Sequence, residues 1–411
     1  MAVIRPFCAV RPAVEYADKV AALPYDVYNR AEAKKEVEKE PLSFLAIDRA
    51  ETQFEDSVSV YAPEVYAKAK ELFEERISQG IFVEDKQSAY YIYQLEMNGR
   101  TQTGIAACAS VDDYLDGTIK KHENTREEKE QDRIRHVDTL SAQTGPIFLA
   151  YRSQATINQL VSKIMETQEP LYDFTAADGI AHRMWKVTEE AVTTLQEAFA
   201  GIQEIYIADG HHRAASAVKV GLKRRKEHPD YDGTEEFNYF LSVLFPDDQL
   251  MIMDYNRCVK DLHGLTKEAF LKAVEECFDV TVLDGAKHPQ AKGQITMYLE
   301  NRWYLLQAKQ ELLAITDPVA ALDVSLLQEY LLKPVLGIED PRTDERIDFI
   351  GGIRGLEELE RRVQTDMTVA FAMYPTSIGE LFAVADAGLL MPPKSTWFEP
   401  KLRSGLLMHR I

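Results

Sequence analysis

The sequence predicts a mixed α/β fold, in which helices pack against β-sheets. Three observations support this prediction: helical and strand-like patterns alternate along the 411 residues, 45% of the residues are hydrophobic, and 28% are charged. A chain of this length forms roughly two to three domains, each with its own core. We expect a first domain at residues 1–262 and a second α/β domain at residues 263–411, whose tail returns to the site of the first.

The N-terminal part of the chain supplies short elements. We predict an extended segment at residues 3–10, a charged helix at 30–39, a strand at 44–47 and a helix at 63–80. The last helix begins at Pro63 and ends at Gly80, which are residue types that favour a helix start and a helix end. Two β-rich runs, 89–97 and 101–111, flank Asn98-Gly99, a dipeptide typical of tight hairpins. An antiparallel pair of strands is therefore expected.

The segment 120–136 is almost wholly polar and mostly charged. Such a run is usually the solvated face of a helix, but clustered acids, bases and imidazoles also suit a functional site. Asp132 and His136 are spaced i, i+4, so a helix places them on one face. After the helix breaker Thr144-Gly145-Pro146, we predict a strand at 147–151, a helix at 157–167, a strand at 181–187 and a helix at 188–199.

The clearest functional pattern lies at residues 205–217. A strand-like run ends in a glycine turn, and polar side chains open the helix that follows: Asp209, Gly210, His211, His212 and Arg213. A helix start has unpaired N–H groups and a partial positive charge, so these side chains converge on an anion, most obviously a phosphate. A buried Asp–His pair that merely caps the helix is the alternative explanation.

The C-terminal part alternates again. We predict a helix up to residue 227, a hairpin formed by 238–245 and 249–255, and a domain boundary near Leu262. Helices are then expected at 266–277, 322–332, 354–365 and 377–388, strands at 279–283, 346–350 and 367–374, and a hairpin turn at Asn301-Arg302. The loop from Met391 to Arg403 carries hydroxyls and cations beside two large aromatic residues. This loop is either a stiff tail or part of an anion site.

Residues 209–213 resemble the phosphate-binding box of the ParB and sulfiredoxin superfamily, which includes free-serine kinases. In that superfamily the box is Gly-x-x-Arg at a helix start, and its nucleotide-using members bind phosphates there together with Mg²⁺. The resemblance implies a ParB/sulfiredoxin-like nucleotide-binding core in the first domain.

A second resemblance spans nearly the whole chain. Several segments together resemble the family known as domain of unknown function 1015: Pro24-Tyr25-Asp26-Val27, Lys121-His122-Glu123-Asn124-Thr125, Asp132-Arg133, Gly145-Pro146-Ile147-Phe148, Ile347-Asp348-Phe349-Ile350-Gly351-Gly352 and Pro393-Lys394-Ser395-Thr396-Trp397-Phe398. Membership of this family implies no particular activity. The resemblance therefore indicates the family of the chain but not a reaction that it would catalyse.

The superfamily resemblance implies ATP or ADP with Mg²⁺ as the bound cofactor. The groups expected to hold it are Gly210, His211, His212, Arg213, Arg133, Lys394, Ser395 and Thr396. Asp209 is expected to hold the metal ion or to orient a histidine. Phosphoryl transfer also needs a base near the accepting hydroxyl, and we expect His122, Glu123 and Asp209 to be the catalytic groups.

Three functional hypotheses follow. The first is a nucleotide-dependent phosphotransferase, or kinase, that acts on a small hydroxyl-bearing metabolite. The second is a nucleotide-binding switch that acts through a partner without chemistry. The third is a metal-dependent phosphohydrolase that uses His122, His211 and His212, although adjacent histidines rarely face one ion. Sulfiredoxin-like reduction is disfavoured because the box holds histidines where that chemistry needs a cysteine.

Composition narrows the partners. The formal charge of −20 disfavours DNA, because such a surface repels a polyanion. The four cysteines form no Cys-x-x-Cys pair, and no stretch is apolar enough to span a membrane. We therefore expect a cytoplasmic protein whose partners are a nucleotide and a small-molecule substrate, and the sequence leaves homo-oligomer formation open.

Overall fold

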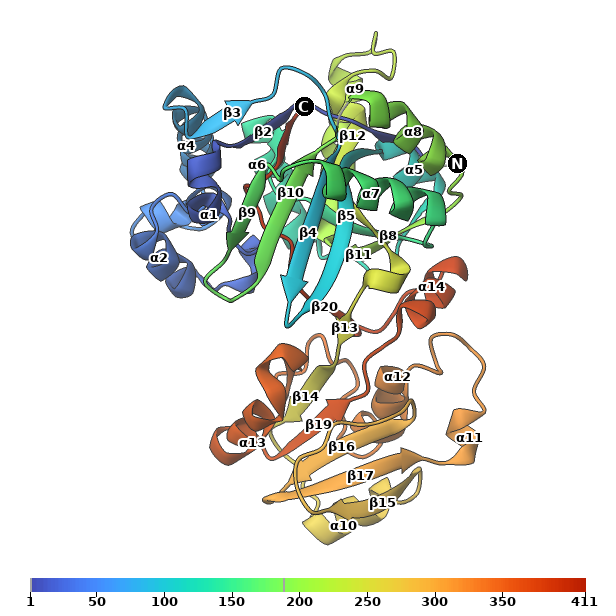
Figure 1. Cartoon of the computed structure of the whole chain (residues 1–411). Helices are drawn as coiled ribbons and strands as arrows, with labels where there is room; N and C mark the ends of the chain where they lie inside the picture. The colour runs from blue at the N-terminus through green and yellow to red at the C-terminus, as the bar shows by residue number, and fades with distance from the viewer. Residues whose placement is uncertain (1, 188) are drawn as a thin grey trace. The chain divides into compact units, whose positions relative to one another are not determined.

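The computed structural model describes residues 2–187 and 189–411 (Figure 1). It confirms a mixed α/β fold and divides into two compact units. The first unit comprises Met1–Leu250 together with Pro400–Ile411, and the second comprises Met251–Glu399. The compact units thus divide before residue 262, and the last segment of the chain belongs to the first unit.

A large sheet forms the centre of the first unit. In the described residues it has nine strands in the order β6-β11-β8-β12-β5-β4-β10-β9, with β1 paired to β5. Their bounds are β1 Ile4–Arg5, β4 Tyr91–Met97, β5 Arg100–Ser110, β6 Ile119–Lys120, β8 Ile147–Tyr151, β9 Tyr172–Thr175, β10 Ala181–Lys186, β11 Ile205–Asp209 and β12 Tyr239–Pro246. The β4–β5 hairpin is confirmed: Asn98 and Gly99 take the positive φ angles, 53° and 75°, that a tight turn requires.

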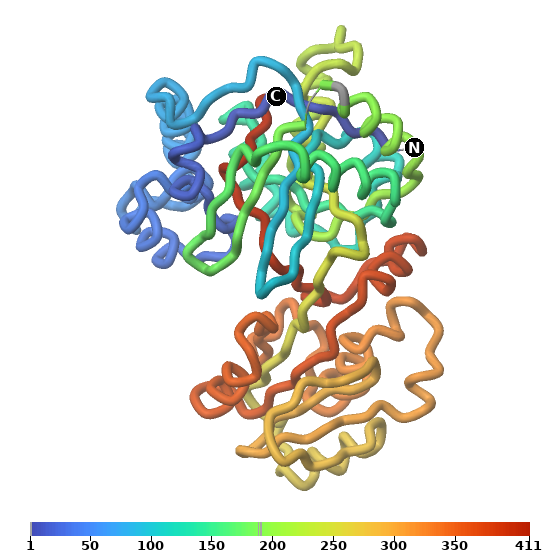
Figure 2. Tube along the Cα trace, viewed as in Figure 1, coloured from blue at the N-terminus to red at the C-terminus, as the bar shows by residue number. Residues whose placement is uncertain are grey.

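A second, four-stranded sheet joins distant parts of the chain. Its order is β3-β2-β21-β7, with β2 at Ala9–Pro12, β3 at Phe82–Glu84, β7 at Ala142–Gln143 and β21 at Met408–Arg410. The C-terminal strand β21 therefore lies between an N-terminal strand and a strand from the middle of the chain (Figure 2). Met408 is fully buried there. This sheet fixes the chain end to the first unit.

Most predicted helices of the first unit are confirmed. They are α2 Arg30–Lys39, α4 Pro63–Ser78, α6 Glu127–Leu140, α7 Ala155–Thr167, α8 Glu189–Ala200 and α9 His211–Glu227, with the shorter α1 Ala17–Val20 and α5 Val111–Asp116 between them. Apolar side chains from α7, α8 and α9 enter one core with the large sheet, including Ile157, Leu195 and Val218. Residue 188, the predicted first residue of α8, lies outside the described residues.

The predicted strand at 44–47 is wrong. The chain forms the short helix α3 at Leu45–Asp48, in which the Arg49 N–H donates to the Leu45 carbonyl at 2.8 Å. Phe44, Leu45 and Ile47 are all buried. A run of four apolar residues satisfies either structure, so its periodicity could not decide between them. Packing of α3 against α4 decides it.

The predicted hairpin at 238–255 is also wrong. β12 pairs with β5 and β8 inside the large sheet, whereas β13, Ile252–Met253, pairs with β20, Trp397–Phe398. Both segments have strand character, but their partners come from elsewhere in the sequence. Spacing along the chain therefore gave the right elements and the wrong pairing.

The second unit contains a six-stranded antiparallel sheet in the order β15-β17-β16-β19-β14-β18. Its strands are β14 Tyr255–Val259, β15 Phe278–Leu283, β16 Gln294–Leu299, β17 Arg302–Ala308, β18 Ile347–Gly351 and β19 Val369–Met373. Its helices are α10 Lys267–Val274, α11 Gln310–Leu313, α12 Asp323–Leu327, α13 Gly355–Thr365 and α14 Ile378–Asp386. Glu300 and Asn301, with φ of 45° and 59°, turn the β16–β17 hairpin one residue before the predicted position. Within the described part of the chain, none of the helices has the length and apolar character needed to cross a membrane.

Candidate functional site

The glycine turn, residues 209–213, has the predicted strand–turn–helix structure. β11 ends at Asp209, and α9 begins at His211. Gly210 lies between them in the left-handed region, with φ 95° and ψ 31°. A Cβ atom at Gly210 would lie 3.2 Å from the Arg213 guanidinium. The glycine therefore allows both the backbone conformation and the close approach of Arg213.

The Arg213 side chain packs against the backbone at Gly145 and Pro146. Its Nη1 donates to the Pro146 carbonyl at 2.5 Å. A Cβ atom at Gly145 would lie 3.5 Å from the same guanidinium. Two glycines thus make room for Arg213, and its described hydrogen bond goes to a carbonyl, which does not neutralise its charge.

Asp209 faces a cation from the chain end. The Lys401 ammonium lies 2.9 Å from its Oδ2. Burial favours the protonated acid, but Lys401 and Arg213 outweigh it and hold the pKa of Asp209 well below its usual range. One carboxylate therefore lies close to two cations.

Sequence reasoning chose other residues of the C-terminal loop. Lys394, Ser395 and Thr396 belong to the second unit, where the Lys394 carbonyl accepts from Arg257 at 3.0 Å and the Ser395 hydroxyl donates to the Pro392 carbonyl at 2.6 Å. Their role in nucleotide binding stays a prediction. Lys401 was missed because no local pattern distinguishes it from the other cations of that loop.

The structure brings His122 and Glu123 to the glycine turn. The rings of His122 and His211 are 4.5 Å apart and nearly perpendicular. The His122 N–H donates to His211 Nε2 at 3.4 Å, and Glu123 lies 3.7 Å from His211 Nδ1. Burial lowers the pKa of His122 to about 4 and that of His211 well below its usual value. Both imidazoles are therefore neutral at pH 7.

His212 points to a different partner. Its Nε2 accepts the Arg126 N–H at 2.9 Å, at the start of α6. Burial lowers its pKa, although the nearby Asp26 opposes the shift. Across residues 2–187 and 189–411 there is no group of three or more His, Cys, Asp or Glu side chains arranged to hold a metal ion. The two adjacent histidines of the turn thus serve different contacts.

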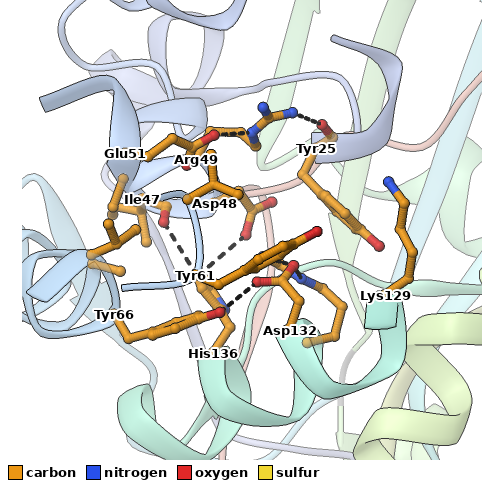
Figure 3. Close-up of a pocket in the computed structure, with 15 residues that line it drawn as sticks. Tyr25, Ile47, Asp48, Arg49, Glu51, Tyr61, Tyr66, Lys129, Asp132 and His136 are labelled. Atoms are coloured by element: carbon orange, nitrogen blue, oxygen red, sulfur yellow. Dashed lines mark hydrogen bonds and ion pairs between the residues drawn. The ribbon is translucent and has the colours of Figure 1, made fainter. Parts of the chain in front are cut away.

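The first unit contains a cavity of about 540 Å³, including its open mouth (Figure 3). We call it the tyrosine cavity. It is lined by Tyr25, Ile47, Asp48, Arg49, Ala50, Glu51, Val60, Tyr61, Val65, Tyr66, Ala69, Lys129, Asp132, Arg133 and His136. These residues come from α3, α4, α6 and the segment between α3 and α4, except Tyr25, which lies before α2. Their side chains combine three tyrosine rings with carboxylates and cations.

Arg133, one of the predicted phosphate ligands, forms an ion pair in this cavity. Its Nε donates to Asp132 Oδ2 at 2.9 Å, its Nη2 lies 2.8 Å from the same oxygen, and its guanidinium lies 4.1 Å from the centre of the Tyr25 ring. The Tyr66 hydroxyl donates to the other Asp132 oxygen at 2.8 Å. Burial opposes ionisation of Asp132, but Arg133 and Tyr66 hold its pKa below the usual value.

A second pocket, of about 410 Å³ including its open mouth, shares residues with the cavity and is also lined by Arg213. It is lined by Arg213 and Gly145 from the turn region and shares four residues with the tyrosine cavity: Tyr25, Asp48, Arg133 and His136. We call these four residues the shared wall. Arg133 and Arg213, far apart in the sequence, thus border the same pocket, as the prediction required. Asp48, which accepts the Thr144 hydroxyl at 2.9 Å, was not predicted as a site residue.

Comparison with known proteins places the chain among relatives. A family profile described as "Protein of unknown function (DUF1015)" matches residues 4–325, which is more than half of the chain. The chain belongs to the DUF1015 family. The resemblance found in the sequence is thereby confirmed. No protein with a curated description matches this DUF1015 chain.

Solved structures similar to this DUF1015 protein include free serine kinase in complex with AMP, with 15% identity and a TM-score of 0.35 over 74% of this chain and 92% of that chain. A conserved hypothetical protein from Pyrococcus furiosus matches with 15% identity and a TM-score of 0.36, over 74% and 94%. C-terminally truncated SbnI from Staphylococcus aureus matches with 11% identity and a TM-score of 0.39, over 73% and 85%. TM-scores this low carry no conclusion about activity or ligand.

Proposed function

We propose that this protein binds a nucleotide at the glycine turn and transfers its terminal phosphoryl group to a small hydroxyl-bearing molecule in the tyrosine cavity. The pair of cations at the turn carries the proposal: Arg213 and Lys401 both lie near Asp209 at a helix start. Guanidinium groups, ammonium groups and free helix N–H groups are the donors that bind phosphate. An ATP or ADP phosphate satisfies all three.

In this proposal the two ligands would approach each other at the shared wall. Arg213 borders the pocket on one side of this wall, and the tyrosine cavity lies on the other. Phosphoryl transfer is catalysed mainly by positioning the two reactants and neutralising phosphate charge. A nucleotide at the turn and an acceptor in the cavity would have Arg133 and Arg213 around the transferred group.

The proposed step balances as follows. The acceptor oxygen forms a bond to the terminal phosphorus, and the bond from that phosphorus to the bridging oxygen breaks, leaving the electron pair on the shortened nucleotide. The hydroxyl proton passes to a carboxylate, and Asp48 suits this role because it borders both pockets. His122 and Glu123 contact His211 and would act by positioning the turn.

Mg²⁺ fits this arrangement. In nucleotide sites Mg²⁺ takes one or two carboxylates and completes its shell with phosphate oxygens and water. Asp209 would supply a carboxylate oxygen, and the ion would neutralise phosphate charge. Asp209 would then bind both Lys401 and the ion, which keeps the nucleotide phosphates at the helix start.

The test incubates the full chain with ATP or ADP, Mg²⁺ and a panel of small hydroxyl compounds, and follows phosphate species by ³¹P NMR. We expect a new phosphomonoester signal that depends on one acceptor and is absent with the Arg213→Gln variant. A nucleotide that binds but stays unchanged with every acceptor would instead support the non-catalytic switch. Release of inorganic phosphate without an acceptor would support the phosphohydrolase, and absence of nucleotide binding would refute all three.

A further inference from the structure

The tyrosine cavity has a charge pattern that the phosphate site does not explain. Its lining includes three carboxylates, Asp48, Glu51 and Asp132, and three cations, Arg49, Lys129 and Arg133. The charges of the lining are therefore balanced before any ligand enters. An ionic ligand needs an uncompensated charge of the opposite sign, so this balance favours a neutral one.

The two arginines of the lining form ion pairs with two of its carboxylates. Arg49 Nε lies 2.5 Å from Glu51 Oε1, and its Nη1 donates to two carbonyls, those of Tyr25 and Tyr28, at 2.9 and 2.7 Å. Arg133 is closed in the same way by Asp132. The described contacts of these two arginines therefore go to groups of the protein, and each arginine already has a carboxylate partner.

The carboxylates keep acceptor capacity. A carboxylate offers about four lone-pair positions. Asp48 accepts the Thr144 hydroxyl through Oδ1, and the described contact of Glu51 uses Oε1. Both carboxylates are only 4% exposed. A ligand that supplies several O–H donors would complete their hydrogen bonding.

The remaining lining is aromatic. The rings of Tyr25, Tyr61 and Tyr66 surround the carboxylates of Asp48 and Asp132 (Figure 3). Burial raises the pKa of Tyr25 to about 12 and raises that of Tyr66 as well, so both hydroxyls stay neutral at pH 7. Aromatic faces provide apolar contact area for the C–H faces of a carbon ring or chain.

We infer that the tyrosine cavity binds a neutral polyhydroxylated molecule, a sugar or cyclic polyol, through the carboxylates of Asp48 and Glu51 and the faces of its tyrosines. The inference rests on the proposed function in one respect: it names the class of the phosphoryl acceptor. A hydroxyl of that molecule at the shared wall would face the phosphate held by Arg213.

The test measures binding to the full chain by saturation-transfer NMR and calorimetry, without nucleotide. The probes are glucose and myo-inositol as neutral polyols, L-serine as a zwitterion and lactate as an anion. We expect a polyol to bind and both charged probes to fail. Asp48→Asn, which keeps the shape but removes the charge, should weaken polyol binding by about tenfold, as expected for a lost charged hydrogen bond.

Tyr61→Ala removes an aromatic wall and should also weaken polyol binding at least fivefold. Tyr231→Ala, an exposed tyrosine outside the cavity lining, is the matched control and should leave it unchanged. ADP titration of the same variants separates the two proposals. ADP binding without binding of either polyol would overturn only the cavity inference, whereas polyol binding without ADP binding would overturn only the proposed function.

A charged probe that binds in place of the polyols would directly contradict a neutral-ligand site in this cavity. The polyol site would also be refuted if Asp48→Asn and Tyr61→Ala, both folded by circular dichroism, bound the polyol as well as the wild-type protein does.

Discussion

The arginines of the glycine turn and of the tyrosine cavity differ in their contact partners. At the turn, the described hydrogen bond of Arg213 goes to the Pro146 carbonyl, and a second cation, Lys401, shares the single carboxylate Asp209. In the cavity, Arg133 and Arg49 each contact a carboxylate. The difference supports the two proposals: a phosphate site at the turn and a site for a neutral molecule in the cavity.

The largest expected effect is the loss of folding stability when the Arg133–Asp132 ion pair of the tyrosine cavity is broken. Asp132→Asn removes the partner of Arg133 and leaves a nearly buried guanidinium uncompensated, which costs about 3 kcal/mol of folding free energy. Urea unfolding of the wild type and the variant measures it. Glu71→Gln, which removes an exposed ion pair with Lys68 on α4, is the control and should change stability little. Equal losses of unfolding free energy in the two variants would show that the Arg133–Asp132 pair stabilises the fold no more than an exposed ion pair does.

The second effect is the pH dependence of folding stability that follows from protonation of His122, which contacts the turn. Burial lowers the folded-state pKa of His122 to about 4, below its unfolded value of about 6.5. The unfolded chain therefore binds one more proton in this window, and stability should fall by about 1.4 kcal/mol per pH unit as the pH drops from 6.5 towards 4.

His122→Gln removes this titration. The gap in unfolding free energy between wild type and variant should therefore narrow as the pH falls, and urea midpoints at pH 7, 6 and 5 measure it. Parallel curves would show that folding does not shift the pKa of His122.

A smaller effect separates backbone strain from ligand contact. Gly210→Ala forces alanine to a φ of 95° beside Arg213, at a cost of about 1–2 kcal/mol, and should weaken ADP binding. Gly117→Ala imposes similar strain at a φ of 86°, but a Cβ atom there meets nothing within 4 Å. Both variants should lose similar stability in urea, and only Gly210→Ala should lose ADP affinity by calorimetry. Equal ADP affinities would remove the turn from the nucleotide site.

The smallest effect tests the chain end. Lys401→Ala removes one of the two cations at Asp209 and should weaken ADP binding about threefold to tenfold, the range of a partly exposed charged contact. Lys401→Arg should retain most of the affinity. Arg410→Ala on β21 of the same segment contacts Glu74 and Glu84 and controls for loosening of the tail. A loss with Arg410→Ala as large as that with Lys401→Ala would make the tail a structural support only.

The sequence predicted the turn well because its information is local. A strand, a glycine and a polar helix start follow one another within residues 205–213, so spacing alone placed Arg213 at a helix N-terminus. The cavity was not predicted because its residues are scattered over Tyr25, Asp48, Tyr66 and Asp132, and nothing in their local sequence shows that they meet. The short helix α3, mistaken for a strand, concealed Asp48 for the same reason.

Lys401 shows the limit most clearly. It lies far along the chain from Asp209, and the sequence offered several cations in that loop as equals. Only the pairing of β21 with β2 and β7 decides which part of the tail joins the first unit. Long-range strand pairing of this kind depends on the whole fold, which also explains why the predicted hairpin at 238–255 had the wrong partner.

The most direct test of the central claim is a calorimetric titration of the full chain with ADP and Mg²⁺, for the wild type and Arg213→Gln. In the proposed site Arg213 supplies charged hydrogen bonds to the phosphate, so the variant should bind about 10- to 100-fold more weakly while keeping its urea midpoint. Lys226→Gln, an exposed cation at the far end of α9, should bind as the wild type does. Wild-type affinity in Arg213→Gln, or no binding by the wild type, would contradict a nucleotide site at the glycine turn.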